Sequence, residues 1–171
     1  AINESVDKII EKPKIHNVII LDNSGSMAGS KFKNAVSGIK EEISVLQKDN
    51  TIEYTQTFAH FANSKPFLSD FNVNINNFSL KNINTNNMTP LYETIVLVLN
   101  SIKASYNDSK VLVKIFTDVK DNSYSTSNKL KAASLIKECE ELGVTITFVG
   151  TDYDVNYIIR NLNIDESNTL T

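Results

Sequence analysis

The chain has 171 residues, of which 41% are hydrophobic and 22% charged, values typical of one folded domain with its own core. Its net charge is −3 and no cluster of Lys and Arg stands out, so a nucleic-acid partner is not expected. The longest apolar runs are too short to cross a membrane, so no membrane segment is expected either.

Residues 1–14 are mostly polar and are predicted to form an N-terminal arm in front of a domain that spans residues 15–171. The β-branched run His16–Leu21 then predicts a strand that is buried on both faces. Next, Ser30 is the predicted cap of a helix whose apolar residues recur at steps of three and four.

Two further strands, at residues 51–59 and 65–68, lie close enough in the sequence to form a hairpin. Half of residues 72–87 are Asn, yet their apolar anchors favour an ordered loop across the surface. Thr89 then opens a predicted helix over residues 91–104.

The rest of the chain continues the alternation of strands and helices. The predicted elements are a strand at 111–116, a helix at 130–142 ended by Gly143, a strand at 144–149 and an amphipathic helix at 154–162. Such alternation predicts an α/β fold with a doubly wound, mostly parallel central sheet and helices on both faces. Sheets of this kind bind ligands at the carboxyl ends of their strands, where the strand order reverses.

Polar residues gather at that edge of the predicted sheet. Asp22, Ser24 and Ser26 directly follow the first strand, and Asp118 directly follows the fourth. Thr89 lies in the loop before the helix that leads into the fourth strand, so it is expected at the same edge. Two carboxylates and three hydroxyls offer only oxygen ligands, which suits Mg²⁺, with Mn²⁺ and Ca²⁺ as alternatives.

These residues form three separated motifs, namely Asp22-x-Ser24-x-Ser26, Thr89 in Met-Thr-Pro-Leu, and Asp118 in Phe-Thr-Asp. In order and spacing the motifs resemble the metal-ion-dependent adhesion site (MIDAS) of von Willebrand factor A (vWA) domains, over about residues 15–163. The resemblance implies a doubly wound sheet with one antiparallel edge strand, which the hairpin would supply. It also implies that the three hydroxyls contact the metal, while the two Asp carboxylates act directly or through water.

The same resemblance implies a function. In that family an acidic residue of a partner protein takes the open position of the metal, so we expect a non-enzymatic, Mg²⁺-dependent protein-binding module. The chain is similar to intracellular bacterial members that serve stress-response or ATPase-linked assemblies. In some members the last helix, here residues 154–162, moves when the metal site closes. One departure is Val119, since bacterial members usually have Gly there, although Asp121-Asn122 matches their common Asp-Asn pair.

Two alternatives follow from the residues themselves. A metal-assisted hydrolase could use the same ion with His60 or Asp121 as the base, although the Gly-x-Ser-x-Gly elbow is absent. A metal-free scaffold is the other alternative, because Asp-Asn-Ser-Gly-Ser is also a common turn composition and Thr89 can simply cap its helix. We interpret His60 as a solvated hairpin residue.

The single cysteine, Cys139, excludes an internal disulfide and favours a reducing compartment. Its place on the apolar face of the helix at 130–142 predicts a small core residue. We therefore expect a cytoplasmic protein without a signal peptide, with a secreted or surface-exposed one as the alternative. The Asn-, Lys- and Ile-rich composition favours a bacterial or phage origin.

Overall fold

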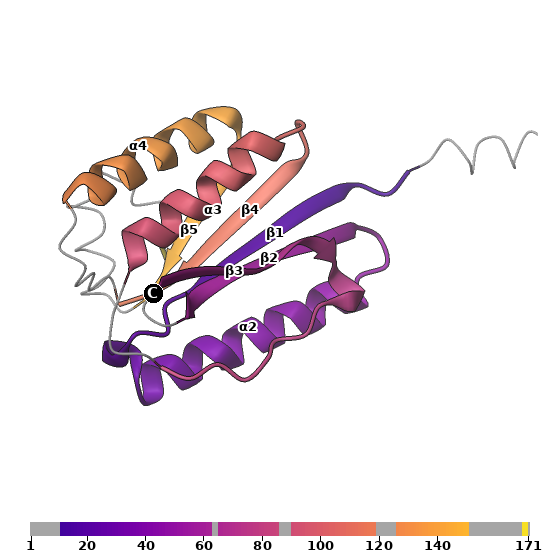
Figure 1. Ribbon diagram of the computed structural model, residues 1–171. Helices are drawn as coiled ribbons and strands as arrows, with labels where there is room; N and C mark the ends of the chain where they lie inside the picture. The colour runs from indigo at the N-terminus through magenta and orange to yellow at the C-terminus, as the bar shows by residue number, and fades with distance from the viewer. Residues whose placement is uncertain (1–10, 63–64, 86–89, 119–125, 151–168, 171) are drawn as a thin grey trace, which may run out of the picture.

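The computed structural model describes residues 11–62, 65–85, 90–118, 126–150 and 169–170, which build a six-stranded sheet with helices packed on it (Figure 1). The strands are β1 (Lys14–Leu21), β2 (Glu53–Ala62), β3 (Lys65–Asn74), β4 (Lys110–Phe116), β5 (Thr145–Val149) and β6 (Thr169–Leu170). The helices are α2 (Ser30–Lys48), α3 (Leu91–Ser105) and α4 (Thr126–Leu142), with 3₁₀ turns η1 (Gly25–Met27) and η2 (Ile75–Asn77).

The strand order is β3-β2-β1-β4-β5-β6, and all neighbours run parallel except β2 and β3. The chain therefore leaves β1 towards one edge of the sheet and later returns to its other side as β4. This is the predicted doubly wound, mostly parallel sheet with one antiparallel edge strand. The order reverses between β1 and β4, so their carboxyl ends form the edge where a ligand site is expected.

The side chains of β1 alternate between two cores, one on each face of the sheet. Val18 and Ile20 pack with α3 and α4, whereas Ile19 and Leu21 pack with α2. Figure 1 shows the same arrangement, with α3 and α4 on one face and α2 on the other. All four β1 side chains are fully buried, which explains why this strand is a continuous apolar run and not an alternating one.

The antiparallel edge strand is longer than the sequence predicts, since β3 continues to Asn74 into the stretch expected to be a loop. Asn72 adopts a positive φ of 53°, and its N–H donates to the Thr57 hydroxyl (2.9 Å) beside a register shift in the ladder. This bulge lets an Asn-rich segment continue a strand despite its low β propensity. The loop prediction was therefore wrong for residues 72–74.

The helix ends follow local backbone rules with one exception. Gly143 ends α4 with a φ of 102°, as predicted for a left-handed C-terminal residue. However, Ser30 is the first residue of α2 and not its cap; Gly29 occupies the cap position with a φ of 93°, a conformation that L side chains rarely adopt. The predicted helix at 154–162 lies outside the described residues, as does most of the predicted arm at 1–14.

None of the helices in the described ranges is long and apolar enough to cross a membrane.

Candidate metal centre

The carboxyl ends of β1 and β4 lie side by side, as the sequence predicts. Leu21 is in register with Phe116, and the Asp22 N–H donates to the Phe116 carbonyl (2.8 Å), so the pairing continues one residue past β1. The two strands therefore deliver Asp22 and Thr117-Asp118 to the same point. This adjacency depends on the strand order and not on any contact local in sequence.

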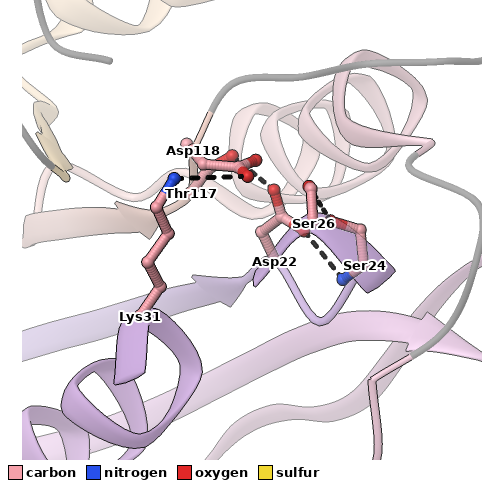
Figure 2. Close-up of polar contacts among 6 residues, drawn as sticks. All are labelled: Asp22, Ser24, Ser26, Lys31, Thr117 and Asp118. Carbon is pink, nitrogen blue, oxygen red and sulfur yellow. Dashed lines mark hydrogen bonds and ion pairs between the residues drawn. The ribbon is translucent and has the colours of Figure 1, made fainter. Parts of the chain in front are cut away.

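Asp22 is fully buried, and two hydrogen bonds fix the orientation of its carboxylate (Figure 2). Oδ1 accepts from the Ser24 N–H (2.9 Å), and Oδ2 accepts from the Thr117 hydroxyl (2.6 Å). The turn η1 then places the Ser24 and Ser26 hydroxyl oxygens 3.0 Å apart. Ser24 is buried and Ser26 is exposed, so this group of side chains extends from the interior of the protein to the solvent.

Asp118 completes the described part of the group from β4. It is 2% exposed, and its Oδ2 lies 3.8 Å from the Nζ of Lys31, a residue of the first turn of α2 (Figure 2). The structure thus brings four of the five predicted residues to one edge, while Thr89 lies outside the described residues. The sequence analysis missed Lys31 and the orienting hydroxyl of Thr117, which become visible only once β1, β4 and α2 are packed together.

The electrostatics of this edge favour a positive ligand. Burial raises the pKa of Asp22 to about 6, against the lowering effect of hydrogen bonds from Ser24 and Thr117, and the nearby Asp118 carboxylate raises it further. Two like charges held together away from water destabilise each other, and a bound cation relieves both the desolvation and the repulsion.

The available ligands also match a hard cation. No three His, Cys, Asp or Glu side chains gather in the part of the chain that the structure describes. A hydroxyl pair next to two carboxylates is instead an oxygen-only set that leaves coordination positions to water and an outside ligand. Mg²⁺ accepts such a set, because it usually keeps several waters in proteins.

Asn23, at the unspecified position of the first motif, holds the site loop in place. Its side-chain amide donates to the carbonyls of Phe61 and Asn84 (both 2.9 Å) and accepts from the Phe61 N–H (2.8 Å). At 1% exposure it is shielded from water, so these bonds are hard to replace. The sequence analysis missed this role, because polar residues are common in the turn after a strand.

His60 does not join this group. It lies in the hairpin, as predicted, but it is half-buried, packs edge-on against Phe67 and has a pKa lowered by burial, so it is less solvated than predicted. It lines a separate hollow of about 360 Å³ together with Asn23 and Asp70, and none of the four clustered site residues borders that hollow. Asp121, the other proposed base, lies outside the described residues.

Cys139 is fully buried in the core shared by α3 and α4, as predicted. Burial raises the pKa of its thiol, which keeps it protonated and unreactive.

Comparisons with known proteins agree on the fold. No family model matches the sequence, and no curated protein matches it either. Among solved structures, the SpRpn10 VWA domain is 12% identical with a TM-score of 0.60, over 91% of this chain and 86% of that one. The pilus adhesin SpaC of Lactobacillus rhamnosus GG is 13% identical with a TM-score of 0.66, over 93% of this chain and 28% of that one.

Two further solved structures are similar to the chain. The manganese-loaded TRAP protein of Plasmodium vivax is 16% identical with a TM-score of 0.57, over 87% of this chain and 62% of that one. The proximal thread matrix protein 1 of the mussel byssus is 16% identical with a TM-score of 0.57, and this chain spans 41% of its length. At these identities the likeness concerns the fold alone: the chain has the fold of vWA domains.

Proposed function

We propose that the chain is a protein-binding module that acts through a divalent cation, with Mg²⁺ preferred. The cation is held at the carboxyl edge of the sheet, and a Glu or Asp carboxylate of a partner protein completes its coordination. The residues assigned to the metal are Asp22, Ser24, Ser26, Thr89 and Asp118.

One observation carries this proposal. Two buried carboxylates, from Asp22 and Asp118, converge from neighbouring strands beside a pair of serine hydroxyls 3.0 Å apart. A buried pair of like charges destabilises a fold unless an opposite charge, such as a bound cation, compensates it. A structural neighbour, the TRAP protein, is manganese-loaded, which supports a metal role for this fold, and the exposed Ser26 supports access for a partner.

Each group has a distinct task in this proposal. The Thr117 hydroxyl and the Ser24 N–H orient Asp22, a positioning role that tunes metal sites from outside the coordination shell. The hydroxyls of Ser24 and Ser26 supply neutral ligands, so the ion keeps positive charge for an incoming carboxylate. A bound Mg²⁺ would supply the electrophilic centre that takes this carboxylate oxygen.

The other two interpretations have less support. No observation favours a hydrolase, because His60 lines a hollow that none of the four clustered site residues borders. The neighbours include a pilus adhesin and a thread matrix protein, which fits a non-enzymatic role. A metal-free scaffold is the alternative that the first experiment below tests. The cytoplasmic location, the bacterial or phage origin and the stress-response role stay predictions.

Calorimetric titration of Mg²⁺ and Mn²⁺ into the wild type tests the metal site. We expect saturable binding that is lost in Asp22→Ala and weakened in Ser26→Ala, an exposed change that does not threaten folding. Glu41→Ala, which removes an exposed carboxylate on α2, is the matched control and should bind as the wild type does. Equal heats from all four proteins would exclude the metal site and leave the scaffold.

The partner is tested by affinity capture with wild-type and Asp22→Ala baits, each in Mg²⁺ and in chelator. A partner that contacts the metal should be retained only by the wild type in Mg²⁺. Retention that ignores both the chelator and the substitution would contradict metal-mediated binding, even where the calorimetry shows a bound ion.

A further inference from the structure

A groove of about 530 Å³ runs between α2 and the crossing segment, which we define as residues 78–85. Figure 1 shows this segment passing alongside α2 towards the carboxyl edge of the sheet. It is tied down at both ends: the Gln47 amide donates to the carbonyls of Ile75 (2.9 Å) and Phe78 (3.1 Å), and Asn23 donates to the carbonyl of Asn84. Both walls of the groove are thus held in place before any ligand arrives.

The groove is apolar inside and basic at its rim. Its interior is lined by partly buried side chains that pack on the α2 core, namely Phe32, Val36, Leu80 and Ile83. The rim carries the exposed lysines Lys33, Lys40 and Lys81.

The charge of this groove is unusual for the chain. None of its described lining residues is acidic, although the whole chain has a net charge of −3. Among the described residues, no salt bridge involves any of the three rim lysines. Positive charge is therefore concentrated at this rim without an ion pair among the described residues, and the groove attracts a negatively charged ligand.

The spacing of the lysines indicates the shape of that ligand. Lys33 and Lys40 are seven residues apart on α2, which places them on one face of the helix about 10 Å apart along its axis. In an extended chain, residues two apart face the same side and lie about 7 Å apart, so acidic residues at alternate positions come within reach of both flexible lysine side chains. Acidic side chains at both ends of such a stretch can meet the lysines, while apolar side chains between them enter the groove.

We propose that this groove binds an extended, acidic segment of a protein partner, in which Glu or Asp residues alternate with large apolar ones. The apolar interior favours a peptide over a nucleic acid, since the groove offers no exposed aromatic platform for bases and only three cations for phosphates. Burial of apolar side chains supplies affinity, and the lysines select the acidic sequence.

The groove also adjoins the candidate metal centre, because Asn23 of the site loop holds the end of the crossing segment at Asn84. A partner seated in the groove can therefore direct a carboxylate to the metal. That link rests on the proposed function, whereas binding of the acidic segment does not require the metal.

Nuclear magnetic resonance on the ¹⁵N-labelled full chain in chelator tests the groove. The probe is a synthetic peptide of about seven residues with alternating Glu and Leu, and the control peptide carries Gln in place of Glu. We expect the Glu peptide to shift amide signals of residues 32–40 and 80–84 and to bind more weakly as salt is raised. The Gln peptide should bind at least about tenfold more weakly.

The variant Lys33→Glu/Lys40→Glu/Lys81→Glu should reduce affinity for the Glu peptide by at least about tenfold. The matched control, Lys110→Glu/Lys131→Glu/Lys137→Glu, makes the same change of charge at exposed lysines elsewhere and should change it by less than about twofold.

Three results would overturn the proposal: no shifts at millimolar peptide, shifts centred away from the groove, or equal loss in both triple variants. Co-sedimentation of the wild type with anionic phospholipid vesicles, lost in the groove variant, would assign the groove to a membrane surface instead. The groove variant should still bind Mg²⁺ calorimetrically. If the wild type binds Mg²⁺ but not the Glu peptide, the groove proposal alone is rejected. If it binds the Glu peptide but not Mg²⁺, the metal centre alone is rejected.

Discussion

Two buried polar clusters lie at opposite ends of β1, and they are built on different principles. The amino-end cluster consists of His16, Asn17, Gln56 and Thr57. Its members are neutral groups that bond to one another: Asn17 Nδ2 donates to Gln56 Oε1 (2.8 Å), and His16 Nε2 bonds the Thr57 hydroxyl (2.6 Å). The Gln56 amide in turn donates to the Thr57 carbonyl (2.9 Å).

The carboxyl-end cluster gathers charges of one sign instead. Asp22 and Asp118 are as buried as the amides at the other end, but both are acids. Lys31 approaches one of them only at 3.8 Å and from a partly exposed position. The first cluster therefore meets its hydrogen-bonding needs internally and stabilises the sheet, whereas the second is complementary to a cation that comes from outside.

The largest effect that follows from this contrast concerns Asp22→Asn. The substitution keeps the shape of the side chain and removes its charge, so we expect Mg²⁺ affinity to fall by more than about a hundredfold. Relief of desolvation and repulsion should at the same time raise the free energy of unfolding in chelator by about 1–2 kcal/mol. Calorimetry and urea denaturation measure the two quantities.

A fall in both quantities would contradict this contrast, since it would make Asp22 a structural residue like those at the amino end. Asp118→Asn tests the same effect at the end of the other strand. It should move both quantities in the same directions as Asp22→Asn does.

The opposite behaviour is expected for Asn17→Leu in the amino-end cluster. The change leaves the Gln56 carbonyl oxygen without its donor in a fully buried position. We expect a loss of about 1–3 kcal/mol in the free energy of unfolding, with Mg²⁺ affinity unchanged. Adding Gln56→Leu should restore part of that loss, because both partners are then apolar. If the double variant loses more stability than the two single variants together, the two side chains do not stabilise the fold as a bonded pair.

The sequence predicted those parts of the molecule that depend on local patterns. The continuous apolar run of β1 and the apolar stripe of α2 are local patterns that tertiary contacts did not override, so both elements form where they were predicted. The meeting of Asp22 with Asp118 could also be predicted, because it needs only strand ends and an order reversal. The length of β3 could not, since its Asn-rich end is held by pairing with β2.

The residues that support the site were beyond sequence reasoning for a related reason. Asn23 bonds Phe61, which is 38 positions away, and Thr117 bonds Asp22 across 95 positions. Polar residues of this kind are common after strands, and nothing local distinguishes the ones that reach a partner. Their roles depend on the register between strands, which one sequence does not specify to the necessary accuracy.

A smaller effect is expected for Lys31→Met. The ammonium group lies 3.8 Å from Asp118 and competes with a cation for that carboxylate. Methionine keeps much of the aliphatic stem and removes the charge, so Mg²⁺ affinity should rise by about three- to tenfold, most clearly at low salt. Lys33→Met, two residues along the same helix, is the matched control and should change it by less than about twofold. A weaker metal affinity in Lys31→Met would instead assign Lys31 a role in positioning Asp118.

The smallest effect is a pH dependence that the amino-end cluster contributes through His16. Burial lowers the pKa of His16 below its ordinary value of 6.5, so the folded state resists a proton that the unfolded chain accepts. Above pH 6.5 both states are neutral and stability is complete, and the free energy of unfolding falls as the pH drops below that value. Lys14 and Glu53 are the charged groups that line the same hollow as His16. Urea denaturation from about pH 7.5 to about pH 5.5 should therefore show a shallower decline in the free energy of unfolding for His16→Gln than for the wild type.

His60, whose pKa is also lowered by burial, is present in both proteins, so its contribution cancels in the difference between them. If the two proteins show parallel profiles of unfolding free energy against pH, His16 accepts a proton as readily in the folded as in the unfolded chain. The amino-end cluster would then tolerate a buried charge.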